Sequence, residues 1–243
     1  SGSHTTPLYG DTLVFSTPGD FNNDISGLVV AGLSVTATGG VRLNGNQIAL
    51  MSGATISKSG SGTYTNNVPL VLGTASGQTV YVEVASGCTI EMPAAISGDA
   101  NLVYGNTSTS TGRVNLRNNG SDYTGTTTAK RGTIYVYSND AFGSTTGGTT
   151  LSGAAQHALK VTFAGVTMDE DVTASNNAND SPNNYGNYPI TFSGSNTFNG
   201  TWSVSGGGFI YNSTSGATTE FNGRVNFAKT HLFARYGVMA FNG

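Results

Sequence analysis

Short runs of alternating apolar and polar residues recur along the chain and predict β-strands that each bury one face. Turns rich in Gly and Asn separate these runs, because both residues adopt positive φ at little cost. No stretch has a convincing helical period, although Asp169–Asp171 could open a single helical turn. An all-β chain is therefore expected. The clearest alternating apolar positions are Leu33, Val35 and Ala37, Val41 and Leu43, Ile48 and Leu50, Val80, Val82 and Val84, and Ile134 and Val136.

A repeated motif suggests how these strands are arranged. The motif consists of an aromatic residue, a small polar residue and then Asn or Gly. It begins at Phe21, Tyr64, Tyr123, Phe198, Phe221 and Phe241. The last three are almost evenly spaced, and the earlier spacings are near multiples of that unit. A unit of roughly 20 residues holds two or three short strands, which make one coil of a parallel β-helix. The chain length then predicts about eleven coils, with Gly and Asn at the corners, aliphatic residues inside, and Thr and Ser outside.

The organisation of the chain follows from this repeat. Residues 8–243 are expected to form a single β-helix segment, and residues 1–7 to be an N-terminal tail or an artificial extension. The stretch 173–188 interrupts the strand pattern with almost no apolar content and predicts a protruding Asn-rich loop.

Composition and charge exclude several classes of protein. Charged residues make up only 9% of the chain, which argues against a coiled coil or a charged disordered tail. The net charge of -3 and the absence of a basic run longer than Lys130-Arg131 argue against a nucleic-acid partner. The single cysteine, Cys88, is expected to be a small buried apolar residue. No metal or other cofactor is expected, and no apolar stretch is long enough for this segment to insert into a membrane.

One part of the chain resembles a known family. Residues 121–151 contain Tyr123-Thr124-Gly125 and, further on, Ala141-Phe142-Gly143, and they resemble the autotransporter-associated β-strand repeat. The family pattern runs as Asn-x-Tyr-Thr-Gly-x-Thr, then Asn-x-Ala-Leu-Gly, then Val-x-Leu. This sequence departs from it at Asp122, Ile134 and Phe142. Elsewhere only the aromatic-x-Gly fragment is kept.

This resemblance implies a right-handed parallel β-helix in the passenger region of a Gram-negative autotransporter. Such a segment would be secreted and displayed on the bacterial cell surface, outside the cell. The chain is then expected to be a fragment of a longer protein that serves as a stalk or adhesive scaffold, with a glycan or a host-surface protein as its partner. The near absence of cysteine is similar to such passengers.

The alternative function is that of a β-helical enzyme, a polysaccharide hydrolase or lyase, although a non-enzymatic role is expected. The candidate catalytic residues are Asp169, Asp171 and Asp180. Glycoside cleavage needs two carboxylates that face one groove, and alternation along a strand would place Asp169 and Asp171 on the same side. The structural interpretation of the same residues is a solvated acidic turn beside a strand.

Exposed aromatic residues are the candidate ligand-binding residues. Tyr185 and Tyr188 lie in the predicted loop together with Asn184 and Asn187, and aromatic rings beside amides suit sugar or protein contacts. Tyr135 and Tyr137 alternate with Ile134 and Val136 and are expected to point outward, either as contacts or as rings that stack between coils. A further alternative is a fibre or tail-fibre segment that associates end to end through its exposed strand edges.

Overall fold

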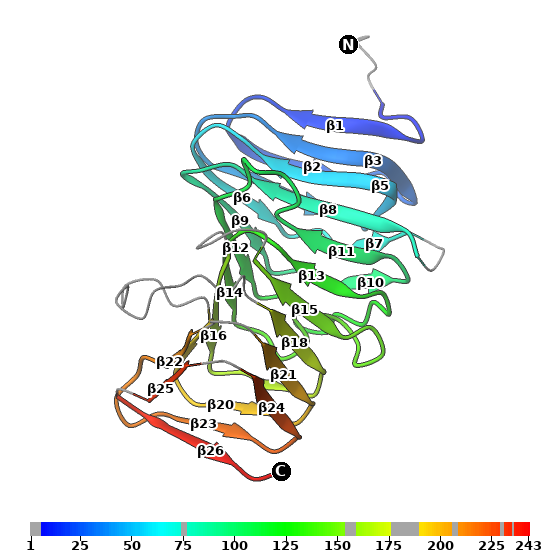
Figure 1. Cartoon of the computed structure of the whole chain (residues 1–243). Coiled ribbons are helices and arrows are strands. Elements are labelled where there is room, and N and C mark those ends of the chain that lie inside the picture. Colours follow the sequence, from blue (N-terminus) through cyan, green and yellow to red (C-terminus); the bar gives the residue numbers. More distant parts are fainter. Residues whose placement is uncertain are drawn as a thin grey trace.

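The computed structural model describes residues 6–73, 77–153, 159–175, 190–205, 209–228, 231–234 and 236–243. In these residues the protein is an all-β parallel solenoid of about nine turns (Figure 1). Every pairing between named strands is parallel, which the fold requires because each coil returns to the same face in the same direction. The described part of the chain contains no helix long and apolar enough to cross a membrane.

The strands of the coils lie on three faces. The first sheet contains β1 (Asp11–Phe15), β3 (Leu28–Val35), β5 (Ile48–Lys58), β8 (Thr79–Val84), β11 (Asn101–Tyr104), β13 (Thr127–Ala129), β15 (Thr149–Ser152), β18 (Val172–Ser175), β21 (Trp202–Ser205) and β24 (Val225–Ala228). The second sheet contains β2 (Gly19–Asn23), β4 (Val41–Gly45), β6 (Gly62–Asn66), β9 (Cys88–Met92), β12 (Arg113–Leu116), β14 (Gly132–Val136), β16 (Leu159–Ala164), β19 (Ile190–Ser193), β22 (Phe209–Asn212) and β25 (His231–Ala234).

The third face is built from two separate groups of strands. Near the N-terminal end, β7 (Leu70–Leu72) and β10 (Ile96–Gly98) pair beside the first half of β5. Near the C-terminal end, the third face contains β17 (Thr167–Met168), β20 (Asn196–Phe198), β23 (Thr218–Phe221) and β26 (Val238–Phe241). This group forms the lowest layers in Figure 1.

The number of turns is lower than the sequence spacing predicts. The coil from Leu33 to its partner Ile56 matches the spacing of the aromatic motif, whereas the next one, from Ile56 to Val82, is longer. The coil that joins Ala174 to Val204 is longer still. Loops that project from the corners lengthen many coils without adding strands. The prediction of eleven coils was therefore too high, whereas the parallel β-helix itself is confirmed.

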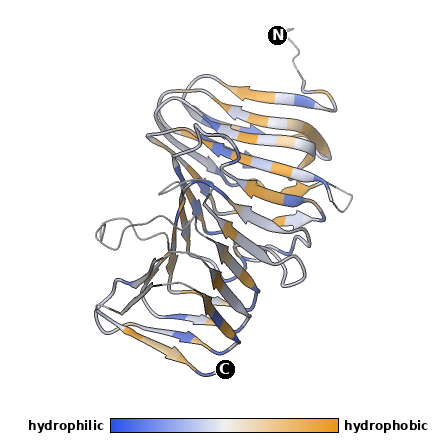
Figure 2. Ribbon diagram, in the orientation of Figure 1, coloured by the Kyte–Doolittle hydropathy of each residue, from blue (hydrophilic) through white to orange (hydrophobic). Residues whose placement is uncertain are grey.

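The predicted alternation of buried and exposed positions is confirmed. The apolar residues of the alternating runs all lie in one continuous core, and Cys88 is buried among them. Figure 2 shows apolar and polar residues alternating along many of the strands. The core is mostly aliphatic toward the N-terminal end, apart from Phe15 and Tyr64, and aromatic toward the C-terminal end, where Phe198 and Trp202 lie 4.6 Å apart between ring centroids.

The aromatic motif forms a stacked column on the third face. Phe198 pairs in register with Phe221, and Phe221 with Phe241, with ring centroids 5.3 Å apart at each step. Phe21 and Tyr64 do not belong to this column, because they lie in β2 and β6 of the second sheet. The sequence motif thus combined residues from two different faces.

The Asn and Gly of this motif also have defined positions. Asn222 donates a hydrogen bond of 2.9 Å to Oδ1 of Asn199, and Asn242 donates one of 2.9 Å to Oδ1 of Asn222, which forms an amide ladder on the outer surface. The glycines turn the corner toward the first sheet. A Cβ on Gly223 would lie 2.2 Å from the carbonyl oxygen of Gly200, so the corner leaves no room for a side chain.

One charged side chain lies inside the stack. Lys58 is buried, and its Nζ donates hydrogen bonds to the carbonyl oxygens of Ala37 at 2.6 Å, Ser59 at 2.8 Å and Ser61 at 3.1 Å. These carbonyls belong to the corners between the first and second sheets. Burial lowers the pKa of Lys58, and the nearby Cys88 partly opposes this shift. The lysine therefore satisfies the corner carbonyls of Ala37 and Ser59 and is a second donor to that of Ser61, which also accepts a bond from Gly39 N.

Candidate functional site

The third face has a gap in its strands, and the candidate site lies there. Between β10 and β17, two successive coils cross this face through residues 121–125 and 138–148 without a named strand. Backbone hydrogen bonds still link the coils, as from Thr124 N to the carbonyl oxygen of Gly98 and from Ser144 N to that of Tyr123. Loops thus replace the sheet in these two layers. Loops can leave a cavity where paired strands would close the surface.

Below this gap, the third face resumes with a variant of the aromatic motif. Met168 pairs with Phe198, so Met168, Asp169 and Glu170 stand where the next coil has Phe198, Asn199 and Gly200. Asp169 Oδ1 accepts a hydrogen bond of 2.6 Å from Asn199 and thereby ends the amide ladder. Glu170 takes the corner position that is glycine in the following coils.

A polar cavity of about 320 Å³ lies beside this variant motif. Its walls come from the two loops that cross the gap and from the start and end of β17. Among the described residues, these walls contain four acidic side chains and no basic or aromatic ones. The lining residues are Ser121, Asp122, Asn139, Asp140, Gly143, Ser144, Thr145, Thr167, Asp169 and Glu170.

Glu170 is the unusual member of this group. Its side chain is only 3% exposed, and its Oε2 is buried without a hydrogen-bond partner. Burial, and then the nearby carboxylates of Asp140 and Asp169, raise the pKa of Glu170 to about 8. The carboxyl group is therefore protonated at neutral pH. A second polar atom of the cavity wall, Ser144 Oγ, is also buried without a partner.

The other two carboxylates near Glu170 are held in place by hydrogen bonds. Asp140 Oδ2 accepts a bond of 3.0 Å from the backbone N–H of Gly120. Asp169 Oδ1 accepts the hydrogen bond from Asn199. These bonds leave the second oxygen of each carboxylate unused.

The structure separates the predicted catalytic residues. Asp169 and Asp171 are both exposed, as the alternation suggested, but they lie at the corner between β17 and β18 and form no helical turn. Asp169 lines the cavity, whereas Asp171 does not and accepts a bond of 2.6 Å from Thr201 N. Asp180 lies outside the described residues. A catalytic role for these residues stays a prediction.

Sequence reasoning missed Glu170 and Asp140 as members of this cavity. Glu170 was visible only as part of an acidic run, and nothing in the run marks its central residue as buried. The signal that could have found it is the alignment of Met168-Asp169-Glu170 with Phe198-Asn199-Gly200. Among the described residues, no three His, Cys, Asp or Glu side chains are placed to bind one metal ion.

A second feature lies on the outer surface of the second sheet. Tyr135 and Tyr137 point outward, as predicted, and their rings stack with centroids 6.0 Å apart. Arg113 lies over the ring of Tyr135 at 4.8 Å, and Arg117 over that of Tyr137 at 3.9 Å. We call Arg113, Arg117, Tyr135 and Tyr137 the tyrosine–arginine patch.

The patch is anchored to the coil that precedes it. Arg117 Nε lies 3.6 Å from Glu91 Oε2, and Asn115 donates a hydrogen bond to Oε1 of the same glutamate. Tyr137 remains 37% exposed. Cation–π contacts and the ion pair connect the four side chains to one another and to Glu91 on an accessible surface. The other predicted ligand residues, Asn184, Tyr185, Asn187 and Tyr188, lie outside the described residues.

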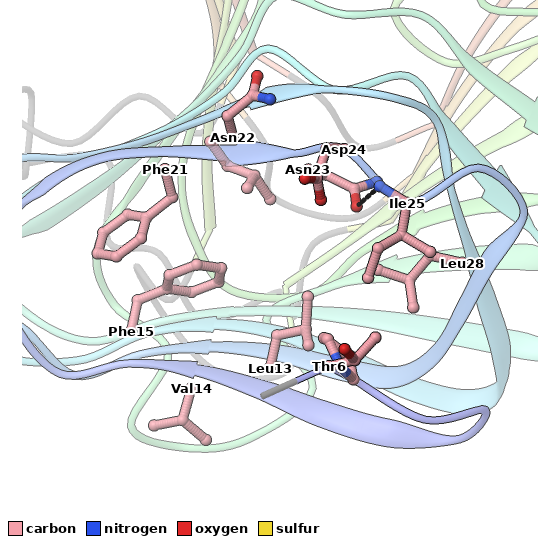
Figure 3. A pocket seen from close by; sticks show the side chains of 12 residues that line it. Thr6, Leu13, Val14, Phe15, Phe21, Asn22, Asn23, Asp24, Ile25 and Leu28 are labelled. Carbon is pink, nitrogen blue, oxygen red and sulfur yellow. Dashed lines mark hydrogen bonds between the residues drawn. The ribbon is translucent and has the colours of Figure 1, made fainter. Parts of the chain in front are cut away.

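A third feature is an apolar cavity of about 440 Å³ at the N-terminal end of the solenoid. Figure 3 shows the rings of Phe15 and Phe21 next to each other at one side of it, with Leu13, Ile25 and Leu28 along the wall. The two rings meet edge to face with centroids 4.9 Å apart. β1 and β2 lie at the ends of their sheets here, so each has one edge without a strand partner in the described residues.

No family model, no curated protein and no solved structure matches this chain. The fold is therefore established by the strand pairing alone. The function has to be argued from the cavity, the tyrosine–arginine patch and the solenoid ends.

Proposed function

We propose that this chain is a rigid, adhesive scaffold from the passenger region of a bacterial autotransporter-like protein, secreted and displayed on the cell surface. The parallel solenoid supports this proposal, because a stack of coils holds its side faces at fixed distances along its axis. The resemblance of residues 121–151 to a passenger repeat and the low content of charged residues also support it.

The tyrosine–arginine patch is the observation that carries the adhesive part of the proposal. Tyr and Arg are enriched among the residues that contribute most to binding at protein interfaces. Their fixed orientation lowers the entropy cost of binding, because little side-chain freedom remains to be lost. The patch lies on a side face of the rod, where a glycan or a protein of a host surface would have access.

The test is binding of the purified chain to arrays of host glycans and host-surface proteins. The double variant Tyr135→Ser/Tyr137→Ser is compared with the wild-type chain, and Tyr9→Ser is the matched control because Tyr9 is an exposed tyrosine of another region. We expect the double variant to bind its ligand at least tenfold more weakly and the control to bind normally. Equal binding by the wild type and the double variant would remove the patch from the proposal.

Deletion of residues 176–187 tests the predicted loop site separately. If this deletion abolishes binding while the double tyrosine variant binds normally, the loop and not the patch carries adhesion. If the wild-type chain binds neither glycans nor host-surface proteins, the adhesive function is rejected.

End-to-end association of the chain is a second candidate function, and the apolar end cavity favours it. Val14 of β1 is 62% exposed beside this cavity, and β24 and β25 present strand edges at the opposite end. A second copy can continue the parallel pairing that joins coils within one chain. We expect the mass measured by light scattering to grow with concentration, and Val14→Asp to prevent this growth. A wild-type chain that stays monomeric at all concentrations contradicts this candidate.

A further inference from the structure

The acidic cavity on the third face is a built site and not only a cluster of surface acids. Its rear wall is Glu170, which is almost fully buried and whose Oε2 has no partner. Ser144 Oγ, contributed by the preceding coil, is buried without a partner in the same wall. Unsatisfied buried polar atoms destabilise a fold by about 1–3 kcal/mol each, so two of them in one cavity indicate a missing hydrogen-bonding ligand.

The charge of the cavity determines the charge of that ligand. Asp122, Asp140, Asp169 and Glu170 line the cavity, and none of its described lining residues is Lys, Arg or His. The carboxylates of Asp140 and Asp169 raise the pKa of the buried Glu170 and therefore oppose its ionisation. A bound cation would remove this repulsion, whereas an anion would add to it.

Hydrogen-bonding geometry favours an ammonium group over a metal ion. Among the described residues, no three His, Cys, Asp or Glu side chains are placed to hold one metal ion, so the cavity lacks the set of side-chain ligands typical of a Ca²⁺ site. An ammonium group has three N–H donors and donates to neutral and charged oxygen acceptors alike. The acceptors present are Glu170 Oε2, Ser144 Oγ and the second oxygens of Asp140 and Asp169. The absence of an aromatic wall argues against a neutral sugar ring.

We propose that this cavity binds the ammonium group of a small aliphatic amine, with Glu170 and Ser144 as the buried acceptors. The volume of about 320 Å³ admits an amine with a short carbon chain. Free diamines and amino sugars share the chemistry of the ammonium group, so the experiment tests one of each. The site is separate from the tyrosine–arginine patch, and the two proposals can fail independently.

Binding is coupled to the ionisation of Glu170. The groups that face its carboxyl are the carboxylates of Asp140 and Asp169 and the phenol of Tyr123, with Asp122 at the cavity wall. At pH 6.5 Glu170 is mostly protonated, and an arriving cation releases its proton. At pH 8.5 the group is already mostly ionised. For a pKa of about 8, affinity should rise about 20-fold between these two pH values.

The test is isothermal titration calorimetry of the full chain with 1,5-diaminopentane and, separately, with glucosamine. We expect the diamine or the amino sugar to bind with proton release at pH 6.5. The pH dependence given above applies to the diamine, because the less basic amine of glucosamine itself loses most of its proton by pH 8.5. The two arms identify which source of the ammonium group the cavity accepts. Failure of both to bind at millimolar concentration overturns the proposal, and so does equally tight binding of tetramethylammonium, which has no N–H donors.

Variants locate the binding to the cavity. Glu170→Gln should weaken binding at pH 8.5 at least tenfold and remove the pH dependence, and Ser144→Ala should weaken it severalfold while keeping every charge. Asp20→Asn, which removes an exposed carboxylate of β2, should bind as the wild type does. Normal binding by a folded Glu170→Gln variant contradicts the proposal. Binding of Ca²⁺ in place of the amines would also overturn it and would make the cavity a metal site.

Discussion

Glu170 and Gly200 occupy equivalent corners of neighbouring coils, and a Cβ placed on Gly200 would lie 2.1 Å from the carbonyl oxygen of Glu170. Gly125 and Gly147 stand at the same corner in earlier coils, with comparable contacts of 2.2 Å and 2.1 Å to the coil before them. The corner is therefore a column of close backbone contacts in which Glu170 alone among these positions carries a side chain. This side chain closes the acidic cavity.

Gly200→Ala should destabilise the protein strongly. The new methyl group would overlap the backbone of the preceding coil, and overpacking of this kind costs about 1–3 kcal/mol or more. The free energy of unfolding in urea measures the effect. Gly40→Ala is the matched control, since a Cβ at Gly40 meets no atom within 4 Å, and its stability should be unchanged or slightly raised. Equal stabilities for the two variants would contradict the close corner contact.

Phe221→Ala should lower the free energy of unfolding by about 3–5 kcal/mol, because it removes a buried ring from the centre of the aromatic column. Phe241→Ala should cost much less, because Phe241 is 47% exposed at the last strand of the third face. Chemical denaturation of both variants provides the comparison. A similar loss at both positions would show that the column is not packed as described.

Glu170 should make the protein less stable as pH rises. Its pKa is about 8 in the folded protein and near 4.5 when unfolded, so between these values the folded state holds the extra proton. The contribution of Glu170 to the free energy of unfolding is therefore fully present below pH 4.5 and falls as the pH rises from 4.5 to 8. Above pH 8 the total loss is on the order of 5 kcal/mol.

Glu170→Gln should abolish this loss, because the amide does not titrate. The difference in melting temperature between wild type and variant should therefore shift in favour of the variant between pH 4 and pH 9. Asp171→Asn is the exposed control in the same acidic run, because Asp171 does not line the cavity. Parallel stability curves for the wild type and Glu170→Gln would contradict the buried environment of the carboxyl group.

Lys58→Met should destabilise the stack although it replaces a charge by an apolar side chain. The variant leaves the carbonyl oxygens of Ala37 and Ser59 without a hydrogen-bond donor, at about 1–3 kcal/mol for a buried acceptor left unsatisfied, whereas that of Ser61 keeps its bond from Gly39 N. Lys130→Met is the control, because Lys130 makes one exposed hydrogen bond to Asn106. Unfolding by guanidinium should show a loss of a few kcal/mol for the first variant and less than about 1 kcal/mol for the second. A neutral Lys58→Met would contradict the role of this lysine at the corner.

Much of the fold could be predicted from the sequence, because a strand with one buried face leaves a direct pattern of period two. Val80, Val82 and Val84 show this pattern, and all three are buried. The same pattern places Lys58 inward after Ile56, so its burial was also readable in principle. The number of coils could not be predicted from the sequence, because corner loops change the length of a coil without changing its strands.

The cavity could not be predicted in the same way. It arises where two coils cross the third face as loops, and loops between paired layers leave no periodic signal. The partners of Glu170 in the cavity wall, such as Ser144 and Asp140, come from the preceding coil. Only the coil register brings these residues together. Strand pairing has to be known before the acidic run can be divided into one buried and two exposed carboxyl groups.

The adhesive scaffold is tested most directly by the adhesion of cells that display this chain. The chain would be exported to the surface of Gram-negative cells through an unrelated translocator, and the attachment of these cells to host-cell monolayers counted. The number of attached cells should be much higher for cells with the wild-type chain than for cells with the translocator alone. Tyr135→Ser/Tyr137→Ser should reduce this number at least tenfold at equal surface density. Attachment no higher than that of the translocator alone would contradict the proposed function.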